Sequence, residues 1–200
     1  WGTLWLAFVT VLFGTILGTL VALLRLSRCK VFQALTGAYI EVLRGTPILL
    51  QLYFFWLLLP KVLPFKVSDT ACIIVALVIN SSSYVAEVIR AGIQAVDKGQ
   101  MEAAKSLGLS NKNAMRYVIL PQAVKNILPA LGNEFVVMVK ETSLASVFFV
   151  GELMTSYKTV QSTTFLAIPS LTIVGIIYFI LNFILTKILK VVERRLQASD

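Results

Sequence analysis

The sequence predicts an all-α fold in which five helices cross a membrane and one polar loop projects from the bundle. Three observations lead to this prediction. Hydrophobic residues make up 58% of the 200 residues and charged residues only 14%, against roughly 25% charged in an ordinary soluble domain. The mean hydropathy is +0.84, which leaves too few polar side chains to cover a soluble globule. The apolar residues also gather in long runs, as expected when lipid is the solvent.

Five segments are candidate spans, because about 20 mostly apolar residues cross a bilayer. They are residues 5–24, 47–59, 70–90, 123–148 and 165–189, so that the whole chain, 1–200, is a single transmembrane domain. The first span ends at a basic cluster, and residues 31–44 after it have apolar side chains at helical spacing. This pattern predicts an amphipathic elbow at the membrane interface.

The second span starts at Pro47, which suits the first turn of a helix. It is short, so we expect it to tilt or to extend into flanking residues. The third is apolar at first and then carries a run of polar residues that includes Ser81–Ser83, a candidate for local unwinding. The fourth is the least hydrophobic. The fifth is strongly apolar and ends among lysines and arginines.

The basic residues predict the orientation of these spans. Of the 18 lysines and arginines, 14 fall in the loops and the C-terminal segment that this topology places on one side, and 3 fall on the other. Lysine and arginine are enriched on the cytoplasmic side of bacterial membranes. We therefore expect a multi-pass membrane protein with its N-terminus outside and its C-terminus in the cytoplasm.

The composition excludes several classes of function. There is no histidine, which removes histidine-based catalysis and most zinc sites, so we predict no catalytic residue and no metal site. The two cysteines, Cys29 and Cys72, fall near opposite membrane faces, which argues against a disulfide. The net charge of +8 is explained by basic loops that meet anionic lipid, and no basic stretch is interleaved with aromatics as in single-strand binders. We expect no nucleic-acid partner.

The polar loop at about residues 97–121 carries a spaced motif. Glu102-Ala103-Ala104 is followed after three residues by Gly108, and after nine more by Val118-Ile119-Leu120-Pro121. This resembles the EAA signature of permease subunits of type I bacterial ATP-binding-cassette (ABC) importers, with valine in place of isoleucine at position 118. Residues 44–47, 84–92 and 140–144 resemble the polar amino acid branch of that family, so the resemblance covers essentially the whole chain.

The local chemistry of the loop fits two short helices joined by a sharp turn. Gly108 permits the positive φ that ends a helix, and Ser110 or Asn111 can cap the next one. The second helix is expected to end near residues 118–120, with Pro121 at its boundary. By resemblance, this pair is the coupling helix that inserts into an ATPase subunit. The coupling residues are then Glu102, Ala103, Ala104, Gly108, Leu120 and Pro121.

The resemblance also implies a location in the bacterial inner membrane, and it implies partners. These are a dimer of ATPase subunits, a second permease subunit (a homodimer is favoured, a heterodimer possible), an extracytoplasmic solute-binding protein and the lipid bilayer. The sequence has no phosphate-binding loop, so this chain is not itself an ATPase and holds no cofactor. ATP and Mg²⁺ are expected on the partner.

Polar residues at membrane depth mark the candidate substrate pathway. Asn80, Tyr84 and Glu87 share one face of the third span, and Asn133 and Glu134 lie on adjacent stripes of the fourth. These five are the predicted substrate-binding residues. For Glu87, as for Lys140 and Glu141, a structural or gating role is favoured, with Lys140 paired to a carboxylate.

Three carboxylates against one lysine in the third and fourth spans favour a cationic amino acid such as arginine, lysine or histidine. A neutral ligand such as glutamine fits if one carboxylate is protonated. The alternative function is a passive channel or an ion-coupled amino acid carrier that works without an ATPase, which gives the spaced loop motif no role. A membrane-embedded enzyme is a weaker alternative, because no nucleophile and base pair is recognisable.

Overall fold

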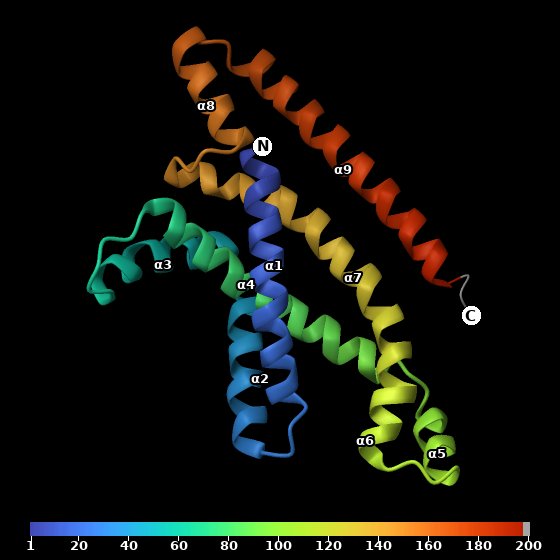
Figure 1. Ribbon diagram of the computed structural model, residues 1–200. Coiled ribbons are helices and arrows are strands. Elements are labelled where there is room, and N and C mark those ends of the chain that lie inside the picture. Colours follow the sequence, from blue (N-terminus) through green and yellow to red (C-terminus); the bar gives the residue numbers. More distant parts are fainter. Residues whose placement is uncertain (198–200) are drawn as a thin grey trace.

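The computed structural model describes residues 1–197 and, over that range, contains helices and no strand. Figure 1 shows long helices packed at varied tilts, with two short ones at the lower end. The α-helices are α1 (Gly2–Arg25), α2 (Lys30–Gly45), α3 (Ile48–Val62), α4 (Asp69–Gln94), α5 (Lys98–Ser106), α6 (Asn111–Ala114), α7 (Leu120–Glu141), α8 (Leu153–Thr164) and α9 (Ala167–Gln197). A π-helical turn, η1 (Met115–Ile119), precedes α7, and a 3₁₀ helix, η2 (Thr142–Phe148), follows it. The predicted all-α class is confirmed.

Three of these helices are long and apolar enough to cross a membrane by length and composition: α1, α4 and α9. The pair α2 and α3 would together make a fourth crossing, broken by a bend of 111°. The 22-residue α7 is not among them, because charged and amide side chains interrupt its apolar surface. Five spans therefore remain a prediction for this fold.

The central contact is between α1 and α4, which cross closely because glycines on α1 face serines on α4. A Cβ added at Gly14 would lie 2.8 Å from the Ser81 hydroxyl oxygen, and one at Gly18 would lie 2.7 Å from the Ser82 carbonyl oxygen. Small residues allow such close approach of helices within a bilayer. This contact fixes the position of the serines on α4, and Ser81 in turn reaches toward α7.

We expect Gly18→Ala to destabilise the bundle by about 1–3 kcal/mol, because the added methyl group would overlap a backbone oxygen and the side chain of Val85. The measurement is the midpoint of thermal unfolding of the purified chain in detergent. Gly175→Ala on α9 is the matched control, since a Cβ there meets nothing within 4 Å. Equal midpoints for the two variants would contradict the close α1–α4 contact.

The main apolar core lies where α1, α3, α4 and α7 meet. Its fully buried members include Leu6, Leu52, Ile73, Leu77 and Met138. A second cluster joins Met101 and Met115, near the two short helices, to Ile119, Ala123 and Ile127 on η1 and α7. The short helices are therefore packed against the start of α7 and do not hang free as a solvated loop.

The segment expected to form an interfacial elbow is α2, which runs beside α1 and is the first arm of the bent pair (Figure 1). Its place at the membrane interface stays a prediction. Another local expectation is corrected by the structure. The third span is not unwound at its serines. Ser82 and Ser83 donate hydrogen bonds to carbonyl oxygens three residues back, within a continuous α4, so their hydroxyls are satisfied without breaking the helix.

The end of the expected fourth span differs as well. The α-helix stops at Glu141 and continues as the 3₁₀ helix η2 up to Phe148. The polar connection after it is itself helical, because the buried carboxylate of Glu152 caps α8 by accepting from the backbone N–H groups of Met154 and Thr155 at 2.7 and 2.6 Å. Glu152 also accepts from the Tyr178 hydroxyl at 2.9 Å, which ties α8 to α9.

Candidate functional site

A polar cavity of about 440 Å³ lies between the α2–α3 bend, α4 and α7. Four of the five predicted substrate residues line it, namely Asn80 and Tyr84 on α4 and Asn133 and Glu134 on α7. The remaining lining residues are Thr46, Pro47, Ile48, Val137, Met138 and Glu141. The structure therefore brings residues of α4 and α7, which lie far apart in the sequence, to one cavity. Cavities of this size suit a small molecule.

The ionisable acidic residues that line the cavity are Glu134 and Glu141. Glu134 is 8% exposed and accepts a hydrogen bond from Ser81 Oγ at 3.2 Å. Glu141, two turns further along α7, is half-buried and faces the same space. No lysine or arginine is among the lining residues of the described chain. Arg44 approaches a lining residue, because its guanidinium lies 5.3 Å from the centre of the Tyr84 ring.

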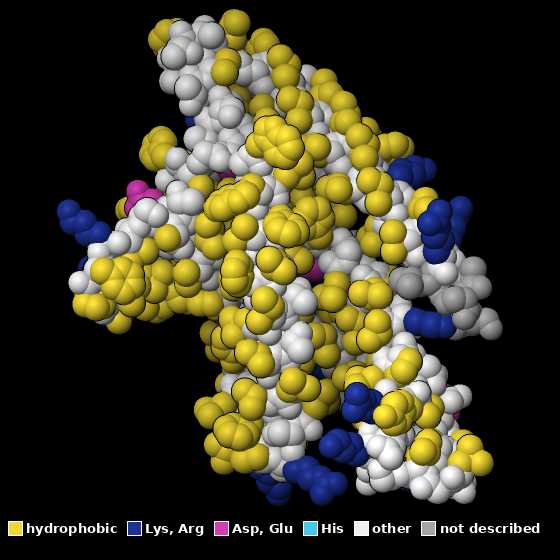
Figure 2. All heavy atoms as spheres, viewed as in Figure 1, with side chains coloured by type: hydrophobic (Ala, Val, Ile, Leu, Met, Phe, Trp, Pro, Cys, Tyr) yellow, Lys and Arg dark blue, Asp and Glu magenta, His cyan; other side chains and the backbone are white. Residues whose placement is uncertain are grey.

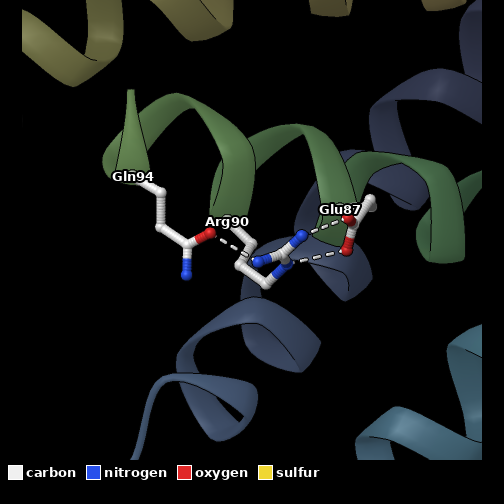
Figure 3. A network of polar contacts seen from close by, with 3 residues as sticks. All are labelled: Glu87, Arg90 and Gln94. Carbon is white, nitrogen blue, oxygen red and sulfur yellow. Dashed lines mark hydrogen bonds and ion pairs between the residues drawn. The ribbon is translucent and has the colours of Figure 1, made fainter. Parts of the chain in front are cut away.

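Glu87 does not line this cavity. Its carboxylate forms a two-point ion pair with Arg90 on the next turn of α4, at 2.9 and 2.5 Å (Figure 3). Arg90 also donates to Gln94 Oε1 at 2.5 Å. The three side chains follow one another along the surface of a single helix, as i, i+3 and i+4 neighbours do. Glu87 is thus neutralised within α4, which fits the structural role.

The expected ion pair of Lys140 is not seen. Its side chain is exposed, and it forms no ion pair with any carboxylate in residues 1–197. It lies next to Glu141 along α7, but successive residues on a helix point about 100° apart. The carboxylates of the cavity are therefore not offset by this lysine.

The contribution of the α2–α3 bend to the site was missed from the sequence. Thr46, Pro47 and Ile48 form part of the cavity wall. The glycine and proline at positions 45 and 47 predicted a helix break, but they do not determine the angle or the direction in which the next helix leaves. The 111° turn places this segment against α4. Glu141 and Met138 were also not selected as lining residues, although they share the helical stripe of Glu134.

The two short helices are joined as the sequence predicted. Gly108 has φ +85°, and the turn is a Schellman motif, in which Leu109 N–H donates to Ala104 O at 3.1 Å and Gly108 N–H to Lys105 O at 2.9 Å. The Ser110 hydroxyl caps α6 by accepting from Asn113 N–H at 3.3 Å. We call residues 98–114, which comprise α5, the turn and α6, the lever.

One surface of the lever is open and the other is packed. Glu102, Ala103 and Leu107 are exposed, and Leu107 retains 84% of its accessible surface. Ala104 is 3% exposed, so its small side chain lies on the packed surface of the lever. Leu120 and Pro121 are exposed at the start of α7.

The expected end of the second helix is wrong. The chain runs from α6 through the π turn η1 straight into α7, and Pro121 lies in the first turn of α7. A proline cannot donate to the carbonyl four residues earlier. The wider π turn accommodates this, since Leu120 N–H bonds Met115 O, five residues back. The lever is therefore joined to α7 without a loop.

Basic side chains gather near the end of the molecule that carries the lever. In Figure 2 most of the visible lysines and arginines lie around α5, α6, the α1–α2 turn and the lower part of α9, while the rest of the visible face is largely hydrophobic. The α1–α2 turn and the residues that flank it include Arg25, Arg28 and Lys30. An apolar belt with a basic end is the surface expected of a protein whose basic end meets the cytoplasmic leaflet.

Comparisons with known proteins agree with this geometry. Residues 14–198 match the family described as binding-protein-dependent transport system inner membrane component. The chain is 40% identical to an arginine transport system permease protein of Bacillus subtilis (strain 168), over 99% of this chain and 90% of that protein. It is 34% identical to a glutamine transport system permease protein of Escherichia coli (strain K12), over 98% of this chain and 90% of that protein.

A solved structure has a similar fold. The crystal structure described as an amino acid ABC transporter with histidines contains a chain that is 46% identical, with a TM-score of 0.92, over 96% of this chain and 90% of that chain. A methionine ABC transporter in an inward-facing form resembles this chain in fold alone, with 18% identity and a TM-score of 0.82 over 98% of this chain and 93% of that chain.

Proposed function

This chain belongs to the inner membrane components of binding-protein-dependent transport systems, and from that premise we propose that it carries a basic amino acid through the polar cavity. It is a multi-pass permease subunit of an amino acid ABC importer. It is not an enzyme, and ATP hydrolysis takes place on a separate subunit. The observation that carries the proposal of a basic substrate is the pair of carboxylates, Glu134 and Glu141, in a cavity lined by no cation of the described chain.

A guanidinium or ammonium group is the natural partner of that wall, since charge-assisted hydrogen bonds to carboxylates are the strongest a ligand can make there. Asn80, Tyr84 and Asn133 supply the uncharged polar groups that would hold the rest of the amino acid. The arginine permease relative supports the same class of ligand. Glutamine, carried by another relative, would require one of the two carboxylates to be protonated. Glu87 supports α4 in this proposal and does not contact the substrate.

The proposed mechanism is alternating access, powered by a dimer of ATPase subunits that binds ATP and Mg²⁺. The exposed surface of the lever, with Glu102, Ala103 and Gly108, docks on an ATPase subunit. Its inner surface, which includes Ala104, packs through Met101 against η1 and α7. The turn η1 joins the lever to α7, which begins with Leu120 and Pro121 and carries Asn133 and Glu134. A displacement of the lever is thereby passed along α7 to the cavity.

The topology belongs to the same proposal. Five spans, at about residues 5–24, 47–59, 70–90, 123–148 and 165–189, place the N-terminus outside and the C-terminus and lever in the cytoplasm. Residues 97–121 form the coupling loop. The second permease subunit is proposed to be an identical copy, and an extracytoplasmic binding protein would deliver the amino acid to the outer side.

The experiment is uptake of radiolabelled arginine, supplied with the binding protein, into proteoliposomes that contain the chain with or without its cognate ATPase and ATP. We expect uptake only when both ATPase and ATP are present, with unlabelled lysine or histidine competing better than glutamine. Uptake without the ATPase would favour the passive channel or ion-coupled carrier. Preference for glutamine over every basic amino acid would overturn the proposed substrate class and leave the transport function in place.

A further inference from the structure

The α2–α3 bend leaves a carbonyl group that the backbone cannot satisfy. In a continuous helix the Leu43 carbonyl would accept from the N–H of residue 47, but Pro47 has no N–H to give. The Gln51 side chain replaces it, because its Nε2 donates to Leu43 O at 2.7 Å. The same nitrogen lies 3.1 Å from Thr46 O and 2.8 Å from Thr46 Oγ1. Gln51 is 6% exposed, so this is a buried staple across the bend.

These contacts fix which way the Gln51 amide faces. The carbonyl oxygens of Leu43 and Thr46 can only accept hydrogen bonds, so the group beside them must be the NH₂ group. Gln51 Oε1 is consequently turned toward α4. There it accepts from Asn80 Nδ2 at 2.9 Å.

The constraint passes on to Asn80. Its Nδ2 must face Gln51 Oε1, since an oxygen in that place would oppose another oxygen. The free end of the amide is therefore Oδ1, on a residue that lines the cavity. No donor within residues 1–197 bonds this oxygen, and it is not a buried, unsatisfied atom. It is an acceptor available to a ligand.

We infer that Gln51 is a specificity-determining positioning residue, which holds the Asn80 amide so that the cavity presents an acceptor and not a donor. The inference rests on the proposed transport of a basic amino acid and adds a residue that does not touch the ligand. With Asn80 Oδ1, Glu134 and Glu141 all accepting, the wall favours a ligand end that only donates, such as a guanidinium. It disfavours the isosteric urea group of citrulline, which has an acceptor oxygen in place of one donor nitrogen.

The test is competition between unlabelled arginine and citrulline for labelled arginine uptake by the reconstituted complex of permease, ATPase and binding protein. Gln51→Met removes the contacts of both ends of the amide, those with Leu43 and Thr46 and that with Asn80, and frees the Asn80 amide to turn over. We expect the preference for arginine over citrulline to fall about 5- to 10-fold, the value of one hydrogen bond. In the Asn80→Ala background the same substitution should change the preference less than twofold, as a coupled pair requires.

Two further variants separate orientation from simple support of the bend. Gln51→Glu keeps an oxygen toward Asn80 and, when protonated, donates to the Leu43 carbonyl, while its ionised form adds a negative charge that favours arginine over citrulline. The preference should therefore not fall below about half of the parent value even if the uptake rate falls. Gln33→Met is the matched control. Gln33 Nε2 also donates to a backbone carbonyl at an inter-helix turn, that of Ser27 at 2.7 Å, away from the cavity. Its loss should leave the preference unchanged.

The outcomes distinguish this inference from the proposed function. If the parent complex does not prefer arginine to citrulline, the proposed substrate class fails. If the parent prefers arginine and Gln51→Met retains that preference, the role of Gln51 is refuted. It is also refuted if Gln51→Met lowers the preference by the same factor in the Asn80→Ala background as in the parent. The preference is a ratio, so it does not depend on how much variant protein assembles. Should Gln51→Met not assemble at all, Gln51→Asn, one methylene too short to span Leu43 O and Asn80, carries the same expectation.

Discussion

Replacing Gly108 with valine is expected to reduce ATP-coupled uptake at least tenfold while the protein still inserts and purifies as before. Gly108 holds φ +85°, and a β-branched residue there is strained by about 1–3 kcal/mol. A Cβ at this position meets nothing within 4 Å, so the penalty comes from the backbone and not from a clash. The chain relieves it by opening the Schellman turn, and the lever then loses its shape.

The measurement combines labelled arginine uptake with co-purification of the ATPase, and the loss of uptake should match a loss of co-purification. Gly108→Asn is the control, because asparagine is among the residues that best tolerate positive φ. It should retain uptake within about twofold. Equal losses with asparagine and valine would show that side-chain bulk matters and the backbone conformation does not.

Gly108→Asp tolerates the turn similarly but places a carboxylate beside exposed Leu107, so we expect it also to abolish coupling.

The features that the sequence predicted correctly are those that depend on a few neighbouring residues. Gly108 could be assigned because a helix stop at positive φ needs only a glycine after the last turn. Ser110 could be assigned as a cap for a similar reason. Asn80 and Glu134 stood out because amide and carboxylate groups are rare inside apolar runs. Their presence in one cavity follows from spacing on α4 and α7 together with close packing of the bundle, whereas their contact with substrate stays a prediction.

The features that were missed depend on the angle between helices and on which of several possible partners a side chain binds. Pro47 indicated a break but not a bend of 111°, so the wall made by the bend and the staple by Gln51 could not be foreseen. Glu87 was assigned to the substrate face because it shares a stripe with Asn80. An i, i+3 partner, Arg90, was available in the sequence, and that spacing could have indicated the ion pair.

We expect Glu134→Gln to lower arginine uptake at least tenfold, because it removes a carboxylate from the cavity. Glutamine has nearly the same shape and its Oε1 can still accept from Ser81, so the fold is retained. The change removes one negative charge from a site that is 8% exposed, where a charge-assisted hydrogen bond is worth about 1.5–3 kcal/mol. Roughly 1.4 kcal/mol corresponds to a tenfold change in affinity. Uptake of a neutral competitor such as glutamine should fall less than that of arginine.

Glu87→Gln is the matched control for this charge, because it makes the same substitution on a carboxylate outside the cavity. It breaks the ion pair with Arg90 and weakens α4 locally, yet leaves the wall with Glu134 and Glu141. We expect the ratio of arginine to glutamine uptake to fall in Glu134→Gln and to stay near the parent value in Glu87→Gln. A parent-like ratio in Glu134→Gln would remove the electrostatic basis for a cationic substrate. If this ratio instead falls only in Glu87→Gln, Glu87 belongs to the substrate pathway. An ion pair that only stabilises α4 would affect the uptake of a cation and of a neutral ligand equally.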